Sequence, residues 1–143
     1  AVEPLRDAHA PSILLATPAE HHRGEKTAAM YAALSPDDFS DGYVSIGVRD
    51  VVRAGRLLGD DDVNNVFERV LARQMPETER AMEALRAEGY APHLCGSGPS
   101  FYLLYAGGAD VAATLSRRVA ETGFVPVATH CLSRERALAV VEE

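Results

Sequence analysis

A short run of glycine and serine between two apolar stretches limits the folds that this chain can adopt. The run is Gly96-Ser97-Gly98-Pro99-Ser100, with His93-Leu94-Cys95 before it and the apolar residues 101–105 after it. Both flanks have the composition of strands, and glycine permits the positive φ that a tight reversal requires. A dinucleotide-binding or P-loop fold would need a helix directly after the run. The pattern therefore predicts a hairpin, whose loop either lets a ligand approach the backbone or only turns the chain.

The remaining pattern favours an α+β fold. A buried strand is predicted over 12–17 between two prolines, and a final strand over 124–131 in which Pro126 indicates an edge. Apolar residues at helical spacing predict helices at 25–34, 44–58, 66–71, 76–88 and 111–122. One strand thus precedes a block of helices, and the hairpin follows it. We expect a ferredoxin-like two-layer sandwich, an antiparallel sheet of about four strands with extra helices inserted after the first strand.

Size and charge narrow the classes of protein and partner. The 143 residues are 47% hydrophobic, which suits a single domain over residues 1–143. Fourteen Lys and Arg residues against 21 Asp and Glu residues give a net charge of −7, which argues against nucleic acid or an anionic membrane as the partner. The sequence has no secretory signal, and no apolar run approaches the ~20 residues of a membrane span, so we expect a cytoplasmic location.

Cysteine, aspartate and histidine residues give no metal-binding spacing. Cys95 and Cys131 lie in apolar surroundings, and we expect two buried core residues; a disulfide or redox pair is the alternative. Asp60-Asp61-Asp62 is interpreted as a solvated loop whose negative charges favour the start of the following helix, with a metal site as the alternative. His21-His22 is interpreted as a polar loop, because no third ligand stands at a suitable spacing. No metal site is predicted.

Four segments resemble the GHMP small-molecule kinases, in their C-terminal half. Residues 94–101 resemble the third motif of that family, a glycine-rich strand-turn-strand that faces the phosphate region of the nucleotide. Asn65-Val66-Phe67-Glu68, Met75-Pro76-Glu77-Thr78 and residues 26–31 are similar to segments of the 4-diphosphocytidyl-2-C-methyl-D-erythritol kinase branch. Lys26 and Val66 stand where that branch usually has serine and aspartate. The resemblance covers nearly the whole chain, in the same order and at similar spacing.

The resemblance implies part of a phosphotransferase of non-mevalonate isoprenoid precursor biosynthesis. The parent enzyme would use ATP and magnesium to phosphorylate an alcohol group of diphosphocytidyl-methylerythritol. The family's phosphate-binding loop, with its N-terminal lysine and aspartate, has no counterpart in residues 1–143. Phosphoryl transfer depends on positioning and charge stabilisation around the γ-phosphate. We therefore expect no catalytic residue, no turnover and no tightly bound nucleotide in this chain alone, and an N-terminal kinase domain as its partner.

The predicted site is the loop Gly96, Ser97, Gly98, Pro99 and Ser100, with backbone amides and the Ser97 hydroxyl as donors to phosphate or substrate. Asn65 either supports this loop or caps its own helix, and the cap is favoured. Two alternatives to the diphosphocytidyl-methylerythritol branch stay open. One is a GHMP kinase of homoserine or mevalonate type. The other is a complete ferredoxin-like regulatory module that binds a metabolite and dimerises through residues 18–89. The oligomeric state also stays open.

Overall fold

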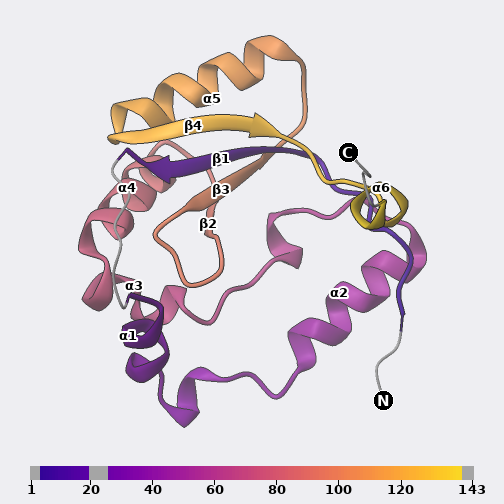
Figure 1. Cartoon of the computed structure of the whole chain (residues 1–143), viewed down its shortest axis with the longest axis horizontal. Helices are drawn as coiled ribbons and strands as arrows, with labels where there is room; N and C mark the ends of the chain where they lie inside the picture. Colours follow the sequence, from indigo (N-terminus) through magenta and orange to yellow (C-terminus); the bar gives the residue numbers. More distant parts are fainter. Residues whose placement is uncertain (1–3, 20–25, 140–143) are drawn as a thin grey trace.

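Four strands form one antiparallel sheet in the computed structural model, which describes residues 4–19 and 26–139 (Figure 1). The strands are β1 (Ser12–Pro18), β2 (Pro92–Leu94), β3 (Phe101–Tyr105) and β4 (Phe124–Thr129), in the order β2-β3-β1-β4. All three pairings of neighbouring strands are antiparallel. The predicted α+β fold with a four-stranded sheet and helices inserted after β1 is confirmed.

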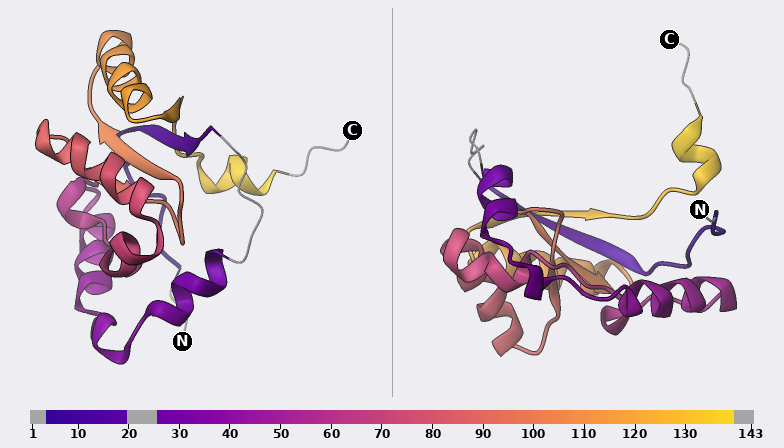
Figure 2. Two further views of the ribbon diagram at one scale, coloured as in Figure 1. Left: turned by 90° about the vertical axis from the view of Figure 1, so that its left-hand side faces the viewer. Right: turned by 90° about the horizontal axis from the view of Figure 1, so that it is seen from below.

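The helices follow the predicted order. Between β1 and β2 the chain forms α1 (Lys26–Ala33), α2 (Tyr43–Ala54), α3 (Glu68–Gln74) and α4 (Pro76–Ala87), with short 3-10 turns at Pro36–Asp38 and Asp60–Asp62. Helix α5 (Ala109–Glu121) joins β3 to β4, and α6 (Arg134–Leu138) follows β4. Figure 2 shows α4 and α5 on the same side of the sheet, whereas α2 lies apart from them in Figure 1. The short α6 was not predicted.

The core lies between one face of the sheet and the helices that cover it. Side chains alternate across a strand, so residues two apart share a face. The buried positions of the strands obey this rule and meet buried residues of α4 and α5: Leu14, Ala16, Phe101 and Leu103 from β1 and β3, Met82 and Leu85 from α4, and Leu115 and Val119 from α5. Val125 and Val127 on the opposite face are each 46% exposed. The helices therefore cover one face only.

Helix α2 ends earlier than the apolar pattern predicts. The pattern extends through Leu58, but the helix ends at Ala54, and Gly55 adopts a left-handed conformation with φ of 66°. Glycine enters that region without steric cost, which is why it ends helices so often. The next residues are drawn into contact with the N-terminal segment, because Leu58 N–H donates to His9 O at 2.8 Å.

The expectation of two buried cysteines is wrong. Cys95 and Cys131 are both exposed and free, not buried, because each lies just beyond the end of a strand, where the chain leaves the sheet. The three aspartates form one 3-10 turn, in which the Asp62 carboxylate accepts the Gly59 N–H at 2.9 Å. His21-His22 lies outside the described residues. Within residues 4–19 and 26–139, no three His, Cys, Asp or Glu side chains gather as a metal site, and no helix is long and apolar enough to cross a membrane.

Candidate functional site

The Gly96–Ser100 loop between β2 and β3 is closed by two backbone hydrogen bonds. Cys95 N–H donates to Ser100 O at 2.8 Å, and Gly98 N–H donates to Cys95 O at 3.0 Å. Gly96 and Gly98 have φ of 57° and 74°, a region that other residues enter at a cost. The amide of Gly98 is therefore used inside the loop, and Pro99 has none to offer. Of the predicted backbone donors, the N–H groups of Gly96, Ser97 and Ser100 are left.

The loop has one open side and one packed side. Among the described residues, no acceptor takes the N–H of Gly96 or of Ser97. A Cβ on Gly96 would meet nothing within 4 Å, whereas one on Gly98 would lie 3.0 Å from Met75 Sδ and 3.2 Å from Leu94 Cδ1. Met75 and Leu94 are themselves buried. The Gly98 side is thus fixed against the core, and the Gly96 side is free for an approaching group.

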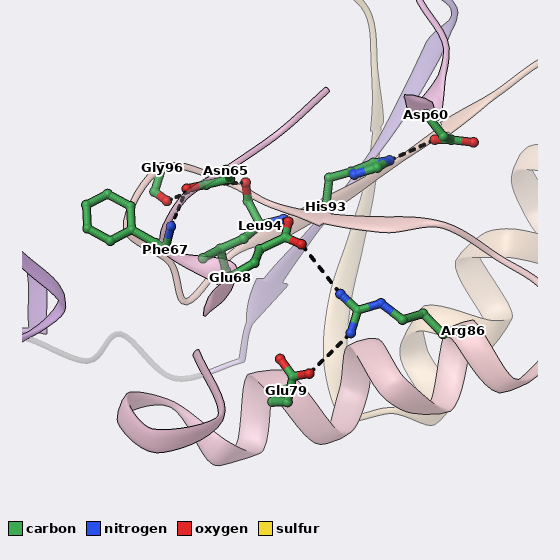
Figure 3. A network of polar contacts seen from close by, with 9 residues as sticks. All are labelled: Asp60, Asn65, Phe67, Glu68, Glu79, Arg86, His93, Leu94 and Gly96. Atoms are coloured by element: carbon green, nitrogen blue, oxygen red, sulfur yellow. Dashed lines mark hydrogen bonds and ion pairs between the residues drawn. The ribbon is translucent and has the colours of Figure 1, made fainter. Parts of the chain in front are cut away.

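Asn65 forms hydrogen bonds both with the turn before α3 and with the loop (Figure 3). Its Oδ1 accepts the Phe67 N–H at 3.0 Å, which caps the turn that leads into α3. Its Nδ2 donates to Leu94 O at 2.9 Å and to Gly96 O at 2.7 Å. Because C=O and N–H point in opposite directions across a trans peptide, the held Gly96 carbonyl turns the Ser97 N–H away from Asn65. The Asn65 side chain thus links the start of α3 to the loop and fixes the direction of the Ser97 N–H.

Three further side chains contact the loop. The Oγ atoms of Thr27 in α1 and Ser97 lie 3.1 Å apart, and Thr78 Oγ1 in α4 donates to Pro99 O at 3.4 Å. Met75, between α3 and α4, packs against Gly98. Sequence reasoning did not assign these roles. The signal was present, because all three residues belong to the segments quoted for the kinase resemblance.

A cavity of about 490 Å³ opens beside the Gly96 end of the loop. Its wall includes Cys95 and Gly96, Tyr102 on β3 and Arg49 on α2. Burial raises the pKa of Tyr102, with Cys95, Glu68 and Asp60 adding to the shift in the same direction. The phenol is consequently protonated at neutral pH and is a neutral O–H donor on the cavity wall. A small molecule in this space would meet the open side of the loop.

A hydrogen-bonded histidine, His93, also lines this cavity. His93 Nε2 on β2 lies 2.8 Å from Asp60 Oδ1 (Figure 3). The ring centroids of His93 and Tyr102 are 5.5 Å apart. These contacts hold the 3-10 turn Asp60–Asp62 against the edge of the sheet. They give the predicted polar segment of three aspartates a structural role.

Comparisons with known proteins identify a family. The family model described as GHMP kinases C terminal matches residues 44–122, a range that runs from α2 to α5 and includes the loop. Two curated relatives from Dehalococcoides mccartyi, strains BAV1 and CBDB1, are both named 4-diphosphocytidyl-2-C-methyl-D-erythritol kinase. Each is 33% identical to this chain over 92 residues, which are 64% of this chain and 32% of the relative.

One solved structure has a similar fold. It is a crystal structure of 4-(cytidine 5'-diphospho)-2C-methyl-D-erythritol kinase, with a TM-score of 0.59 and 22% sequence identity over 82% of this chain and 41% of that chain. The present chain thus spans less than half the length of the proteins that it matches. A glycine loop between two strands, held by the helices before it and matched by the family model across its whole length, leads to one conclusion: this chain belongs to the GHMP kinase family, as a C-terminal domain.

Proposed function

We propose that this chain is the C-terminal domain of a 4-diphosphocytidyl-2-C-methyl-D-erythritol kinase, an ATP-dependent phosphotransferase that acts on an alcohol group. The curated relatives that carry this name support the choice of branch. The shares of their length that the chain spans, 32% of each relative and 41% of the solved structure, support an N-terminal domain as its partner. In this proposal the N-terminal domain binds ATP and supplies the catalytic base.

The open side of the loop carries the proposal. Phosphate oxygens are hydrogen-bond acceptors, and the N–H groups of Gly96 and Ser97 have no acceptor among the described residues. The Ser97 hydroxyl, 3.1 Å from Thr27 Oγ1, is a third possible donor. The absence of a Cβ on Gly96 lets a bulky anion approach the backbone. We assign these groups to the phosphate region of the bound substrates, where fixed donors stabilise the charge of the transferred group. Magnesium is used by the family, but the described residues offer no ligand set for it, so we give this chain no role toward the metal.

The chain of 143 residues is expected to show no ATP-dependent phosphorylation of diphosphocytidyl-methylerythritol. The donors of one loop hold only part of the reacting groups, and phosphoryl transfer requires both substrates and the metal in one arrangement. ADP release and the ³¹P spectrum of the acceptor measure the reaction, with the full-length gene product as the positive control. Turnover by residues 1–143 alone would contradict the proposed division of labour.

The identity of the acceptor is tested with the full-length gene product and three alcohols. We expect diphosphocytidyl-methylerythritol to be phosphorylated with a higher kcat/KM than homoserine or mevalonate. Lys26 and Val66, which depart from the usual residues of the branch, are the reason to include the other two acceptors. A preference for homoserine or mevalonate would move the chain to another branch of the family. A coding sequence with a start codon close to Ala1 and no glycine-rich Ser-Ser loop upstream would instead favour the stand-alone metabolite-binding module.

A further inference from the structure

The side chain of Glu68, the first residue of α3, is bonded to the strand that leads into the loop. Strand β2 lies at the edge of the sheet, so one side of it has no neighbouring strand. The Leu94 N–H is nevertheless paired, because Glu68 Oε1 accepts it at 2.7 Å (Figure 3). A hydrogen bond to a carboxylate is stronger than one to a neutral acceptor. Glu68 thus takes the place of a neighbouring strand at the last residue of β2.

The carboxylate of Glu68 is itself held from α4. Its Oε2 lies 3.6 Å from Arg86 Nη2, and Arg86 Nη1 donates to Glu79 Oε1 at 3.2 Å. Figure 3 shows Arg86 between the two carboxylates. The side chains of Glu79 and Glu68 are 19% and 29% exposed, so water reaches them only in part. An arginine between two carboxylates restricts the orientation of both, because its N–H groups have fixed directions.

We propose that Glu68 and Arg86 are positioning residues for the Gly96–Ser100 loop: Arg86 orients the Glu68 carboxylate, and Glu68 fixes the Leu94 peptide from which the loop begins. Asn65 holds the carbonyl of the same Leu94, so this residue is bound on both its N–H and its C=O. Glu68 also lines the cavity beside Gly96, whereas Arg86 does not, so Arg86→Gln tests positioning without changing the wall of the cavity. Their effect on catalysis rests on the proposed function; their effect on the loop does not.

Helix α4 holds both ends of the loop. Arg86 acts on the β2 end through Glu68, and Thr78 in the first turn of α4 donates to Pro99 O near the β3 end. If α4 shifts, both ends shift together and the direction of the Ser97 amide is kept. Without the Glu68–Arg86 contact only the Pro99 end stays bound to α4. The β2 end can then rotate relative to it.

Amide hydrogen exchange of the 143-residue chain tests the contact directly, with Glu68→Gln and Arg86→Gln as the variants. Glutamine at position 68 keeps an oxygen for the Leu94 N–H but turns an NH₂ group toward Arg86, where two donors oppose each other. We expect Leu94 exchange to be about 10-fold faster in each variant, since a hydrogen bond to a charged group is worth about one power of ten or more. The double variant should exchange no more than about twofold faster than the faster single variant, because both changes act through one hydrogen bond.

Glu83→Gln and Arg117→Gln are the matched controls. Both side chains are exposed, on α4 and α5, and neither forms a hydrogen bond or an ion pair within the described residues. We expect the exchange of Leu94 and the chemical shifts of the Gly96 and Ser97 amides to be the same as in the unmodified chain. Equal Leu94 exchange in the position-68 variant, the position-86 variant and the controls would overturn the proposal, whatever the activity of the enzyme.

The full-length kinase provides the second readout. For Glu68→Gln and Arg86→Gln we expect kcat to fall about 10-fold with a smaller change in KM, because misdirected donors weaken contacts to the transition state more than substrate binding. Unchanged kcat in an active kinase, despite faster Leu94 exchange, would overturn the catalytic part of the proposal. Faster exchange in variants of a protein whose unmodified form phosphorylates none of the three alcohols would instead support the positioning contact and contradict the proposed function.

Discussion

Replacing Gly98 by alanine is expected to lower the free energy of unfolding by about 2–3 kcal/mol, whereas the same change at Gly96 should cost only about 1 kcal/mol. Both residues have a positive φ, so each alanine has a similar backbone cost. Only Gly98 adds crowding, because its new Cβ would meet Met75 Sδ at 3.0 Å and Leu94 Cδ1 at 3.2 Å. Those two side chains are buried and cannot move away without disturbing the core. Urea unfolding of the two variants measures the difference.

Variants of Gly98 and Gly96 also distinguish the effect of packing against the core from the effect of blocking the approach of a ligand. In the full-length kinase, Gly98→Val should reduce kcat by about 100-fold, because the larger side chain pushes the loop away from its position. Gly96→Ala should raise KM although it destabilises the protein only slightly, since its Cβ would project into the open side of the loop. Equal unfolding free energies for the two alanine variants would contradict the packed position of Gly98. Unchanged turnover in Gly98→Val would contradict the proposed role of the loop in the phosphate region of the bound substrates.

Local signals predicted most of the fold. The short apolar runs of β1 and β3, next to proline or glycine, and the helical spacing in α4 and α5 are properties of consecutive residues, and the structure has strands and helices there. The predictions are wrong where contacts between residues far apart in the sequence determine the structure. The apolar spacing predicted that α2 extends to Leu58. The Leu58 N–H instead donates to the carbonyl of His9, 49 positions earlier, and the helix ends before it. The apolar neighbours of Cys95 suggested burial, yet the chain has left the sheet at that residue.

The site was predicted as a loop, but its support was not. Glycine, serine and flanking strands are enough to place a hairpin, because turn chemistry is local. The contacts that aim the loop come from far along the chain: Glu68 reaches Leu94 across 26 positions, and Asn65 reaches Gly96 across 31. No periodicity reports such pairings. Asn65 and Glu68 belong to a segment that was quoted for the kinase resemblance. Their hydrogen bonds to the loop and to Leu94 give a physical reason for that pattern.

Asn65 provides the second large effect, because one side chain makes three hydrogen bonds. Asn65→Ala should lower the free energy of unfolding by about 2–4 kcal/mol, as the Phe67 N–H loses its cap and the carbonyls of Leu94 and Gly96 lose their donor. Asn64→Ala is the matched control, since its side chain is exposed and makes no hydrogen bond within the described residues. We expect it to change the unfolding free energy by less than about 0.5 kcal/mol. Similar losses for the two variants would contradict the assigned contacts.

Asn65→Asp distinguishes the hydrogen bond that caps the turn before α3 from the two hydrogen bonds to Leu94 O and Gly96 O. Aspartate is as good a helix cap as asparagine, so the start of α3 and the exchange rate of the Phe67 amide should be retained. The carboxylate has no N–H to donate, and it would place negative charge against the two carbonyl oxygens that Nδ2 now holds at 2.9 and 2.7 Å. The Gly96 peptide should then turn away from position 65 and carry the Ser97 N–H with it. NMR shifts of Gly96 and Ser97 that move while those of α3 stay constant would show that Asn65 aims the loop. If instead α3 loosens and the loop amides keep their shifts, Asn65 is a cap alone.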